Sequence, residues 1–267
     1  MRNKFSWVGS DKDFIDEKNV QLVDRVAVGR FGGNSSAGQY KNEDGCIVWV
    51  GDDWELAMVL DAHYSAESAE LVINTLIEFE HELIDLIGKP GFHHVQDKLL
   101  NIFQSAEFLN QCKKVKGETA CLICIRKESY LWWFSVGDCV VYVFHPELIA
   151  LNQFQLNQRQ FYEWIGYVNT FDKTVPCLSS GVRELRKGVN RIFMTTDGLL
   201  ECPGQPFSDP IDLVELLDTK QLEEAFSSIL TKIEKNNVRD STTMIAWTVD
   251  NPIEGSIPSD IVDSMKV

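Results

Sequence analysis

The sequence has no long hydrophobic run and few basic residues. No stretch of the 267 residues approaches the roughly 18 to 20 apolar residues that span a bilayer, and the opening MRNKFSW is too polar for a signal peptide. Lys and Arg number 25 against 40 Asp and Glu, giving a formal net charge of −15 without any basic patch. Such a surface repels phosphate backbones and anionic lipids. We therefore expect a cytoplasmic protein with no nucleic-acid and no membrane partner.

The seven cysteines match neither a disulfide framework nor a zinc site. Their number is odd, they are spread through apolar runs, and the chain is long enough to build a core without disulfides. Cys121 and Cys124 form a C-x-x-C pair, but within TACLICI, where strand residues three apart face opposite sides of a sheet. We expect reduced thiols, with these two in the core.

The chain also lacks Pro/Gly/Ser-rich linkers, low-complexity tracts and internal repeats, which favours one domain. Strand-like runs cover residues 26–31, 46–50, 54–60, 119–125, 130–136, 140–144, 191–196 and 243–249. Helical periodicity covers residues 65–87, 94–113, 209–218 and 220–236, and residues 152–175 are expected to be irregular with one short helix. Two helices inserted as a pair between groups of strands indicate α+β layers rather than alternating βαβ units.

Several aspartates lie at the ends of predicted core strands. Asp61 follows the apolar run ELAMVL, Asp197 follows RIFMTT, and Asp240 precedes STTMIAW, while Asp138 follows LWWFSVG. Carboxylates held close together repel one another unless a cation neutralises them, and oxygen ligands suit Mg²⁺ or Mn²⁺. Taken singly, each aspartate could equally serve as a turn residue or a helix cap.

Taken in order, these residues resemble the metal-dependent serine/threonine protein phosphatases of the phosphatase 2C (PPM) type, as a divergent bacterial-type member. The resemblance covers about residues 26–249, and its matching pieces are KNED, VLDAH, GETA, SVGDCVVYVF, TTDGLLE and VRDSTTMIAW. It implies a four-layer αββα sandwich of two antiparallel β-sheets flanked by helix pairs, with the metals at one end. We expect a single domain of this kind over residues 1–250 and a loose C-terminal tail over residues 251–267.

The resemblance implies a centre of two Mn²⁺ or Mg²⁺ ions. Asp61 bridges the ions, the backbone carbonyl of Ala62 binds one of them, and Asp197 and Asp240 complete the ligand set of the other. Asp44 acts mainly through water. A water between the ions attacks phosphorus directly, without a phosphoenzyme.

Further roles follow from the same resemblance. Glu43 also acts through water, and Glu201 lies next to the metal ligands without binding an ion itself. Asp138 with Asp197 can hold a third, weaker ion. His63 corresponds to the proposed general acid that protonates the leaving alcohol.

The chain departs from the family pattern at the substrate phosphate. Gln39 occupies the position of an arginine that usually clamps this phosphate, and Lys41 can supply a point charge but not a bidentate grip. Ala62 and Tyr64 stand where the family usually has glycine. Alanine can replace glycine at position 62 only if the backbone there has a negative φ.

Three functions are compatible with these residues. The first is a monomeric phosphatase acting on phosphoserine or phosphothreonine of a protein. The alternative is a weakened or inactive phosphatase-like protein that binds a phosphoprotein or regulatory partner, as Gln39, Ala62 and Tyr64 indicate. Hydrolysis of a small phosphoester is the third, whereas a Ser-His-Asp hydrolase is disfavoured because no G-x-S-x-G motif is present.

Overall fold

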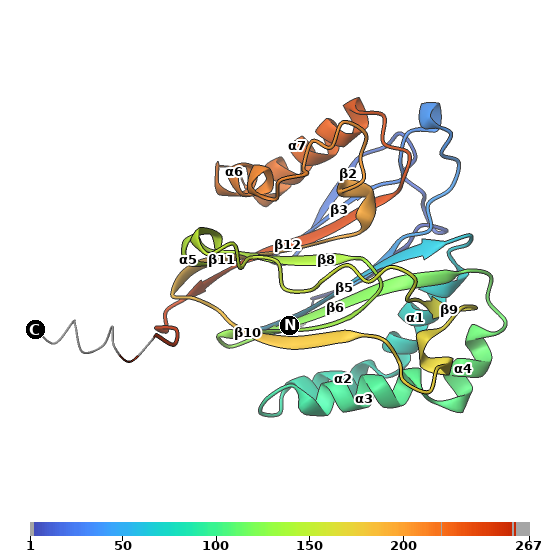
Figure 1. Cartoon of the computed structure of the whole chain (residues 1–267), viewed down its shortest axis with the longest axis horizontal. Helices are drawn as coiled ribbons and strands as arrows, with labels where there is room; N and C mark the ends of the chain where they lie inside the picture. The colour runs from blue at the N-terminus through green and yellow to red at the C-terminus, as the bar shows by residue number, and fades with distance from the viewer. Residues whose placement is uncertain (1–2, 220, 258, 260–267) are drawn as a thin grey trace, which may run out of the picture.

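Two β-sheets lie face to face in the computed structural model, which describes residues 3–219, 221–257 and 259 (Figure 1). The larger sheet contains, in spatial order, β1 (Asn3–Val8), β4 (Gly45–Val50), β5 (Trp54–His63), β6 (Glu118–Lys127), β7 (Tyr130–Val136) and β10 (Ser179–Glu184), with β9 (Ile165–Gly166) paired to β6. The smaller sheet contains β2 (Asn19–Val23), β3 (Val26–Phe31), β12 (Thr242–Asn251), β11 (Gly188–Thr195) and β8 (Val140–Phe144). Every pairing in the described strands is antiparallel.

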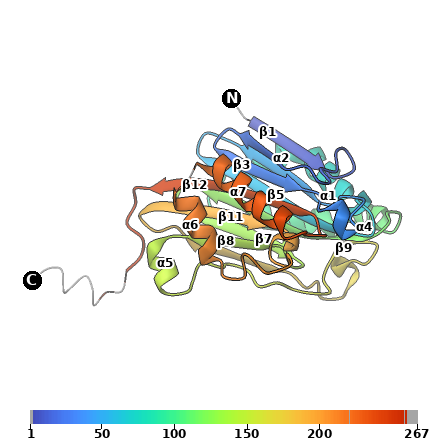
Figure 2. The same ribbon diagram turned by 90° about the horizontal axis from the view of Figure 1, so that it is seen from above.

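Helices cover the outer face of each sheet, as Figures 1 and 2 show. The larger sheet is covered by α1 (Glu67–Glu78), α2 (Glu80–Ile87), α3 (His93–Phe103) and α4 (Ala106–Cys112). The smaller sheet is covered by α6 (Ile211–Thr219) and α7 (Leu222–Lys235), while α5 (Pro146–Ala150) follows β8. The four layers and the α+β class predicted from the sequence are confirmed.

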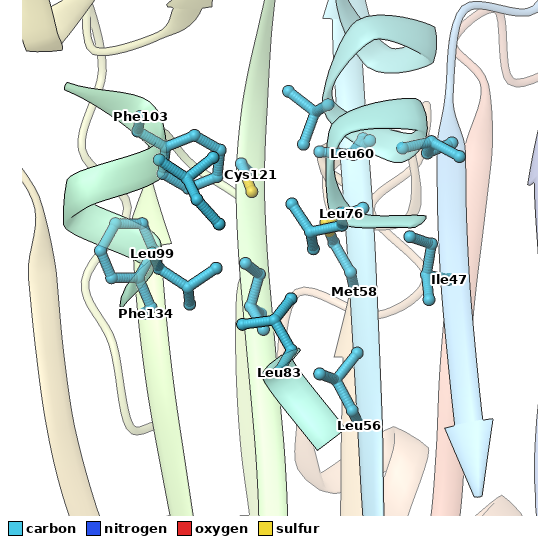
Figure 3. Packing of buried hydrophobic residues seen from close by; sticks show 14 of the residues in the cluster. Ile47, Leu56, Met58, Leu60, Leu76, Leu83, Leu99, Phe103, Cys121 and Phe134 are labelled. Atoms are coloured by element: carbon cyan, nitrogen blue, oxygen red, sulfur yellow. The ribbon is translucent and has the colours of Figure 1, made fainter. Parts of the chain in front are cut away.

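Each interface between layers is filled by apolar side chains. Helix residues Leu76 and Leu83 lie beside Met58 of β5 in the first interface (Figure 3). Val59, the next residue of β5, faces the other way and packs between the two sheets with Ile245 of β12. Alternate residues of a strand point to opposite faces, so a strand covered on both sides must be apolar throughout. This explains why the central strands could be recognised as unbroken apolar runs.

Both long helices predicted from the sequence are interrupted. The helix expected over residues 65–87 breaks at Phe79, whose φ and ψ are −91° and 10°, and continues as α2. The helix expected over residues 94–113 ends at Phe103 and restarts as α4. Ser105 has extended backbone angles and its side chain accepts a hydrogen bond from the Phe108 amide at 3.2 Å. Serine at such a position favours a new helix start over continuation.

The cysteines are unpaired, as expected. Six of the seven are buried and Cys177 is partly exposed. Burial raises the pKa of the Cys46 and Cys112 thiols to about 12 in each case. These thiols therefore behave as apolar core groups.

The chain after β12 runs back along the connection between β10 and β11. Arg186 Nη1 donates to the Ser256 carbonyl at 2.9 Å, and the Ser256 amide donates to Glu184 Oε2 at 3.0 Å. The tail predicted over residues 251–267 lies largely outside the described residues, and the single domain over residues 1–250 stays a prediction. Among the helices of the described residues, none has the length and apolar character needed to cross a membrane.

Candidate active site

Five strand ends meet at one end of the sandwich. The register pairs Gly45 of β4 with Leu60 of β5, and it pairs Thr195 of β11 with both Met244 of β12 and Val140 of β8. The residues just beyond these pairs therefore gather in one place. They are the residues singled out from the sequence, namely Asp44, Asp61, Asp138, Asp197 and Asp240.

Asp44 connects the two sheets. Its carboxylate is buried beside β4 and accepts hydrogen bonds from Thr243 Oγ1 of β12 at 2.7 Å and from Thr196 Oγ1, just after the end of β11, at 3.2 Å. A second link joins the Asp197 amide to Asp61 Oδ2 at 3.5 Å. The site is thus built across the gap between the sheets.

The carboxylates raise one another's pKa. Burial is the main cause for Asp44 and Asp61, and the negative charges of Asp197 and Asp240 add to it. Burial, with the charge of Asp240, raises the pKa of Asp197 to about 6. The pKa of Asp240 is raised by desolvation of its carboxylate and by the charges of Glu201 and Glu43, although part of the residue is exposed at the surface. Charged together, these groups are unfavourable unless a cation lies among them.

The chemistry of these residues fits a hard divalent cation. Their donors are all oxygen, the preference of Mg²⁺ and Mn²⁺, and Asp197 Oδ1 is buried without a hydrogen-bond partner among the described residues. Within the described part of the chain, no three His, Cys, Asp or Glu side chains already form a ready-made metal site. Ions bound here would therefore draw on further oxygen atoms, such as the carbonyl of Ala62 or water.

A cavity of about 480 Å³ lies over the carboxylates. His63 stands in its wall with the side chain 49% exposed, and His63 Nδ1 is 4.0 Å from Asp61 Oδ1. The residues predicted from the sequence that line the cavity are Gln39, Lys41, Glu43, Asp61, Ala62, His63, Glu201 and Asp240. Asp44, Asp138 and Asp197 are outside this lining and are buried.

No protein-family model matches the chain, and no curated protein matches it. Solved structures do. A bacterial serine phosphatase carrying an arginine-to-glutamate mutation superimposes with a TM-score of 0.62 at 16% identity, covering 93% of this chain and 98% of that one. The catalytic domain of the serine/threonine phosphatase PstP with two manganese ions gives 0.53 at 16% identity, covering 94% and 100%. RsbX in complex with magnesium gives 0.53 at 15% identity, covering 87% and 100%.

The chain has the fold of these phosphatases. At these identities the likeness establishes the fold, and it confirms the αββα sandwich that the phosphatase 2C resemblance implied.

The backbone accepts the replacement of glycine at Ala62. Ala62 continues β5, and it is absent from the residues with positive φ in the described part of the chain. The left-handed backbone falls two residues later, at Tyr64, whose φ is +73°. Alanine is therefore compatible with the backbone at position 62, as the sequence analysis required.

Neither Gln39 nor Lys41 offers an unpaired positive charge to the cavity. Gln39 Nε2 lies 3.5 Å from Ser241 Oγ. Lys41 Nζ donates to Glu43 Oε1 at 2.5 Å and to the carbonyl of Tyr64 at 2.9 Å. The charge of Lys41 is thus already paired with a carboxylate.

The sequence interpretation missed Arg159. Its Nη2 lies 2.5 Å from Glu201 Oε1, 3.4 Å from Asp138 Oδ2 and 3.5 Å from Asp197 Oδ2. Arg159 belongs to residues 152–175, where neither strand nor helix periodicity was found. The sequence offered one clue to Arg159: no other arginine lies between Arg126 and Arg183.

Proposed function

We propose that this protein is a metal-dependent phosphatase that removes phosphate from phosphoserine or phosphothreonine of a protein. The observation that carries the proposal is the cluster of Asp44, Asp61 and Asp197, which are buried, with Asp240 exposed at its edge; the pKa of each of the four is raised. The cluster lies at one end of a sandwich shared with bacterial serine/threonine phosphatases. That combination favours a divalent-cation centre over a purely structural ion-pair network.

In this proposal Asp61, Asp197, Asp240 and the Ala62 carbonyl hold two ions of Mn²⁺ or Mg²⁺. Bound ions would lower the pKa of a water molecule and stabilise charge on the phosphoryl oxygens. Asp44 is fixed by two threonine hydroxyls, so its position does not depend on the ions. Because water is the nucleophile, no residue of the chain becomes phosphorylated.

His63 is the proton donor to the leaving alcohol. Its half-exposed ring lines the cavity, and the carboxylate of Asp61 stands 4.0 Å from Nδ1. The protonated imidazole is the form that would donate this proton.

A protein substrate is favoured over a small phosphoester. A second cavity, of about 650 Å³, shares the lining residues Tyr40, Lys41, Glu43 and Tyr64 with the first. Tyr40 and Tyr64 are 74% and 75% exposed on the boundary between the two cavities. A polypeptide that carries the phosphate could therefore extend past the site, which a small phosphoester would not do.

The test is phosphate release from p-nitrophenyl phosphate and from a phosphothreonine peptide, with Mn²⁺, with Mg²⁺ and with EDTA. We expect turnover with either ion, and its loss in EDTA, in Asp61→Ala and in Asp240→Asn. Asp52→Asn is the matched control, because Asp52 is an exposed aspartate in the turn at the other end of β5. Undiminished turnover in Asp61→Ala or Asp240→Asn would overturn the two-metal assignment.

The pairing of Lys41 with Glu43 weakens the grip on a substrate phosphate, which favours a second candidate function, a weakened or inactive phosphatase-like protein that binds a phosphoprotein or regulatory partner. Calorimetry separates the two functions. Mn²⁺ binding without turnover on either substrate would support the binding protein, and Mn²⁺ binding with turnover would support the enzyme.

A further inference from the structure

Residues 152–160 run alongside β8 and are hydrogen-bonded to it, although they form no regular strand. The Val143 amide donates to the Phe154 carbonyl at 2.7 Å, the Leu156 amide to the Val141 carbonyl at 3.0 Å, and the Gln160 amide to the Gly137 carbonyl at 2.9 Å. The last of these bonds lies one residue from Arg159 and one residue from Asp138. The backbone of this segment therefore fixes where the Arg159 side chain begins.

Asn157 anchors the segment in the core. Its side chain is buried, and its Nδ2 donates to the Cys139 carbonyl at 2.8 Å and to Ser135 Oγ at 3.0 Å. Its Oδ1 accepts a hydrogen bond from the Val141 amide at 2.9 Å. These three bonds, to β7, to β8 and to the residue before β8, hold the chain two residues before Arg159, so the guanidinium is built into the site rather than resting on its surface.

The Arg159 guanidinium lies among three carboxylates. Nη2 is shared between Glu201, Asp138 and Asp197, and the side chain is 22% exposed. The Phe161 ring lies 4.8 Å from the guanidinium carbon and adds a favourable cation–π contact. One positive charge thus faces three negative ones at the edge of the cluster.

We propose that Arg159 takes the place of the third, weaker ion, so that this chain binds two divalent ions where the phosphatase 2C resemblance allows three. The third ion would need Asp138 and Asp197, and Arg159 already contacts an Oδ2 atom of each. A divalent cation set beside a fixed guanidinium is repelled by it. The inference rests on the proposed function, because it takes the two principal ions as given.

Arg159 also acts on those principal ions through Asp197. The Oδ2 atom of Asp197 faces Arg159, while Oδ1 is the atom that has no hydrogen-bond partner among the described residues. Arg159 is in this sense a positioning residue. It holds one oxygen of Asp197 and leaves the other for an ion.

The experiment is the equilibrium Mn²⁺ content of the full chain, measured by dialysis against increasing Mn²⁺, together with melting temperature in EDTA. We expect two ions per chain in the wild type, a third and weaker ion in Arg159→Ala, and two ions in Arg159→Lys, which retains the charge. Arg159→Ala should also melt at a lower temperature than the wild type in EDTA, because three carboxylates lose their cation. Arg191→Ala is the matched control, since Arg191 is similarly exposed, at 24%, and pairs with Asp218 instead.

The outcomes are distinguishable. Three ions in the wild type, or no third ion in Arg159→Ala, overturn the inference and leave the proposed function standing. An unchanged ion content combined with a raised KM for the phosphopeptide would instead assign Arg159 to the substrate phosphate. A wild-type chain that binds no Mn²⁺ overturns the proposed function and the inference together.

Discussion

Tyr64 holds the left-handed conformation beside the proposed proton donor. Its φ is +73°, an arrangement that suits glycine and is strained for a bulky side chain. Its carbonyl accepts a hydrogen bond from Lys41 at 2.9 Å. The strain therefore lies within the cavity wall, next to His63.

We expect Tyr64→Gly to stabilise the fold by about 1 kcal/mol, because the left-handed conformation costs glycine nothing. Urea unfolding measures the change. Tyr40→Gly is the control, since Tyr40 is 74% exposed and is absent from the positive-φ residues of the described chain. That control should lose stability, and a loss in Tyr64→Gly as well would show that Tyr64 is not strained.

Gln39 lines the cavity at the position where the phosphatase 2C resemblance places a phosphate-clamping arginine. We expect Gln39→Arg to lower KM for a phosphopeptide about tenfold, with a smaller effect on kcat, because a charge-assisted contact contributes roughly 1.5 kcal/mol. Steady-state kinetics on one phosphothreonine peptide measures both constants. Gln39→Lys separates charge from geometry, and an unchanged KM in Gln39→Arg would mean that other groups bind the phosphate.

The aspartates could be predicted from the sequence because each adjoins an apolar strand, a local pattern. Arg159 could not, since its three partners lie 21, 38 and 42 residues away along the chain. The pairing of Lys41 with Glu43 was also missed, although the two are only two residues apart in sequence. Which of two nearby groups a lysine faces depends on the cavity around it, and the cavity is made by distant elements.

At the scale of elements, β5 and β6 carry the acidic site at one end and a buried ion pair at the other. Glu55 lies opposite Arg126 in the register and is fully buried. Arg126 Nε donates to Glu55 Oε2 at 2.5 Å, and Arg25 contacts the same carboxylate. The Glu55–Arg126 ion pair therefore lies at the end of β5 and β6 that is away from the cavity over the carboxylates.

Removing Glu55 should strongly destabilise the fold. We expect Glu55→Gln to lose about 3 kcal/mol, because the buried Arg126 and the half-buried Arg25 would lose their counter-charge. Glu147→Gln is the control, since Glu147 pairs with Arg186 at a side chain 55% exposed and should change stability by less than about 1 kcal/mol. Equal losses in the two variants, measured by urea unfolding, would contradict the buried-pair account.

The central strands were predictable, and so was the wholly apolar edge strand β8, whereas three other edge strands were not. β1, β2 and β10 all lie at sheet edges, and β10 reads SSGVRE with an exposed valine. Edge strands are held by backbone hydrogen bonds to one neighbour, so their composition need not be apolar. Residues 152–160 could not be recognised in the sequence for the same reason, because backbone hydrogen bonds and one buried asparagine hold them along β8.

At the scale of the whole molecule, the acidic cluster opposes folding when no cation is bound. The pKa of Asp197 is about 6 in the folded chain, against roughly 3.9 for an unfolded aspartate. Between these values the folded state binds more protons, so its stability falls as pH rises, and above the folded pKa the loss is complete. Asp44 and Asp61 extend the same trend because their pKa values are also raised.

In EDTA, the melting temperature should therefore be lower at about pH 7.5 than at about pH 5.5, and Mn²⁺ should raise it more at the higher pH. Thermal unfolding at both pH values, with EDTA and with Mn²⁺, measures the difference. Asp197→Asn, which cannot ionise, should flatten the pH dependence in EDTA. A gain from Mn²⁺ that is the same at both pH values would argue against binding at these carboxylates.

The distribution of the thiols has a practical consequence. With six cysteines enclosed by the layers, an alkylating dye added to the folded chain has one sulfur within reach, that of Cys177. The Cys177 amide donates to Thr170 Oγ1 at 2.7 Å, in the stretch that follows the Arg159 segment. The native sequence thus already carries a single attachment point for a fluorescent reporter, without any engineered cysteine.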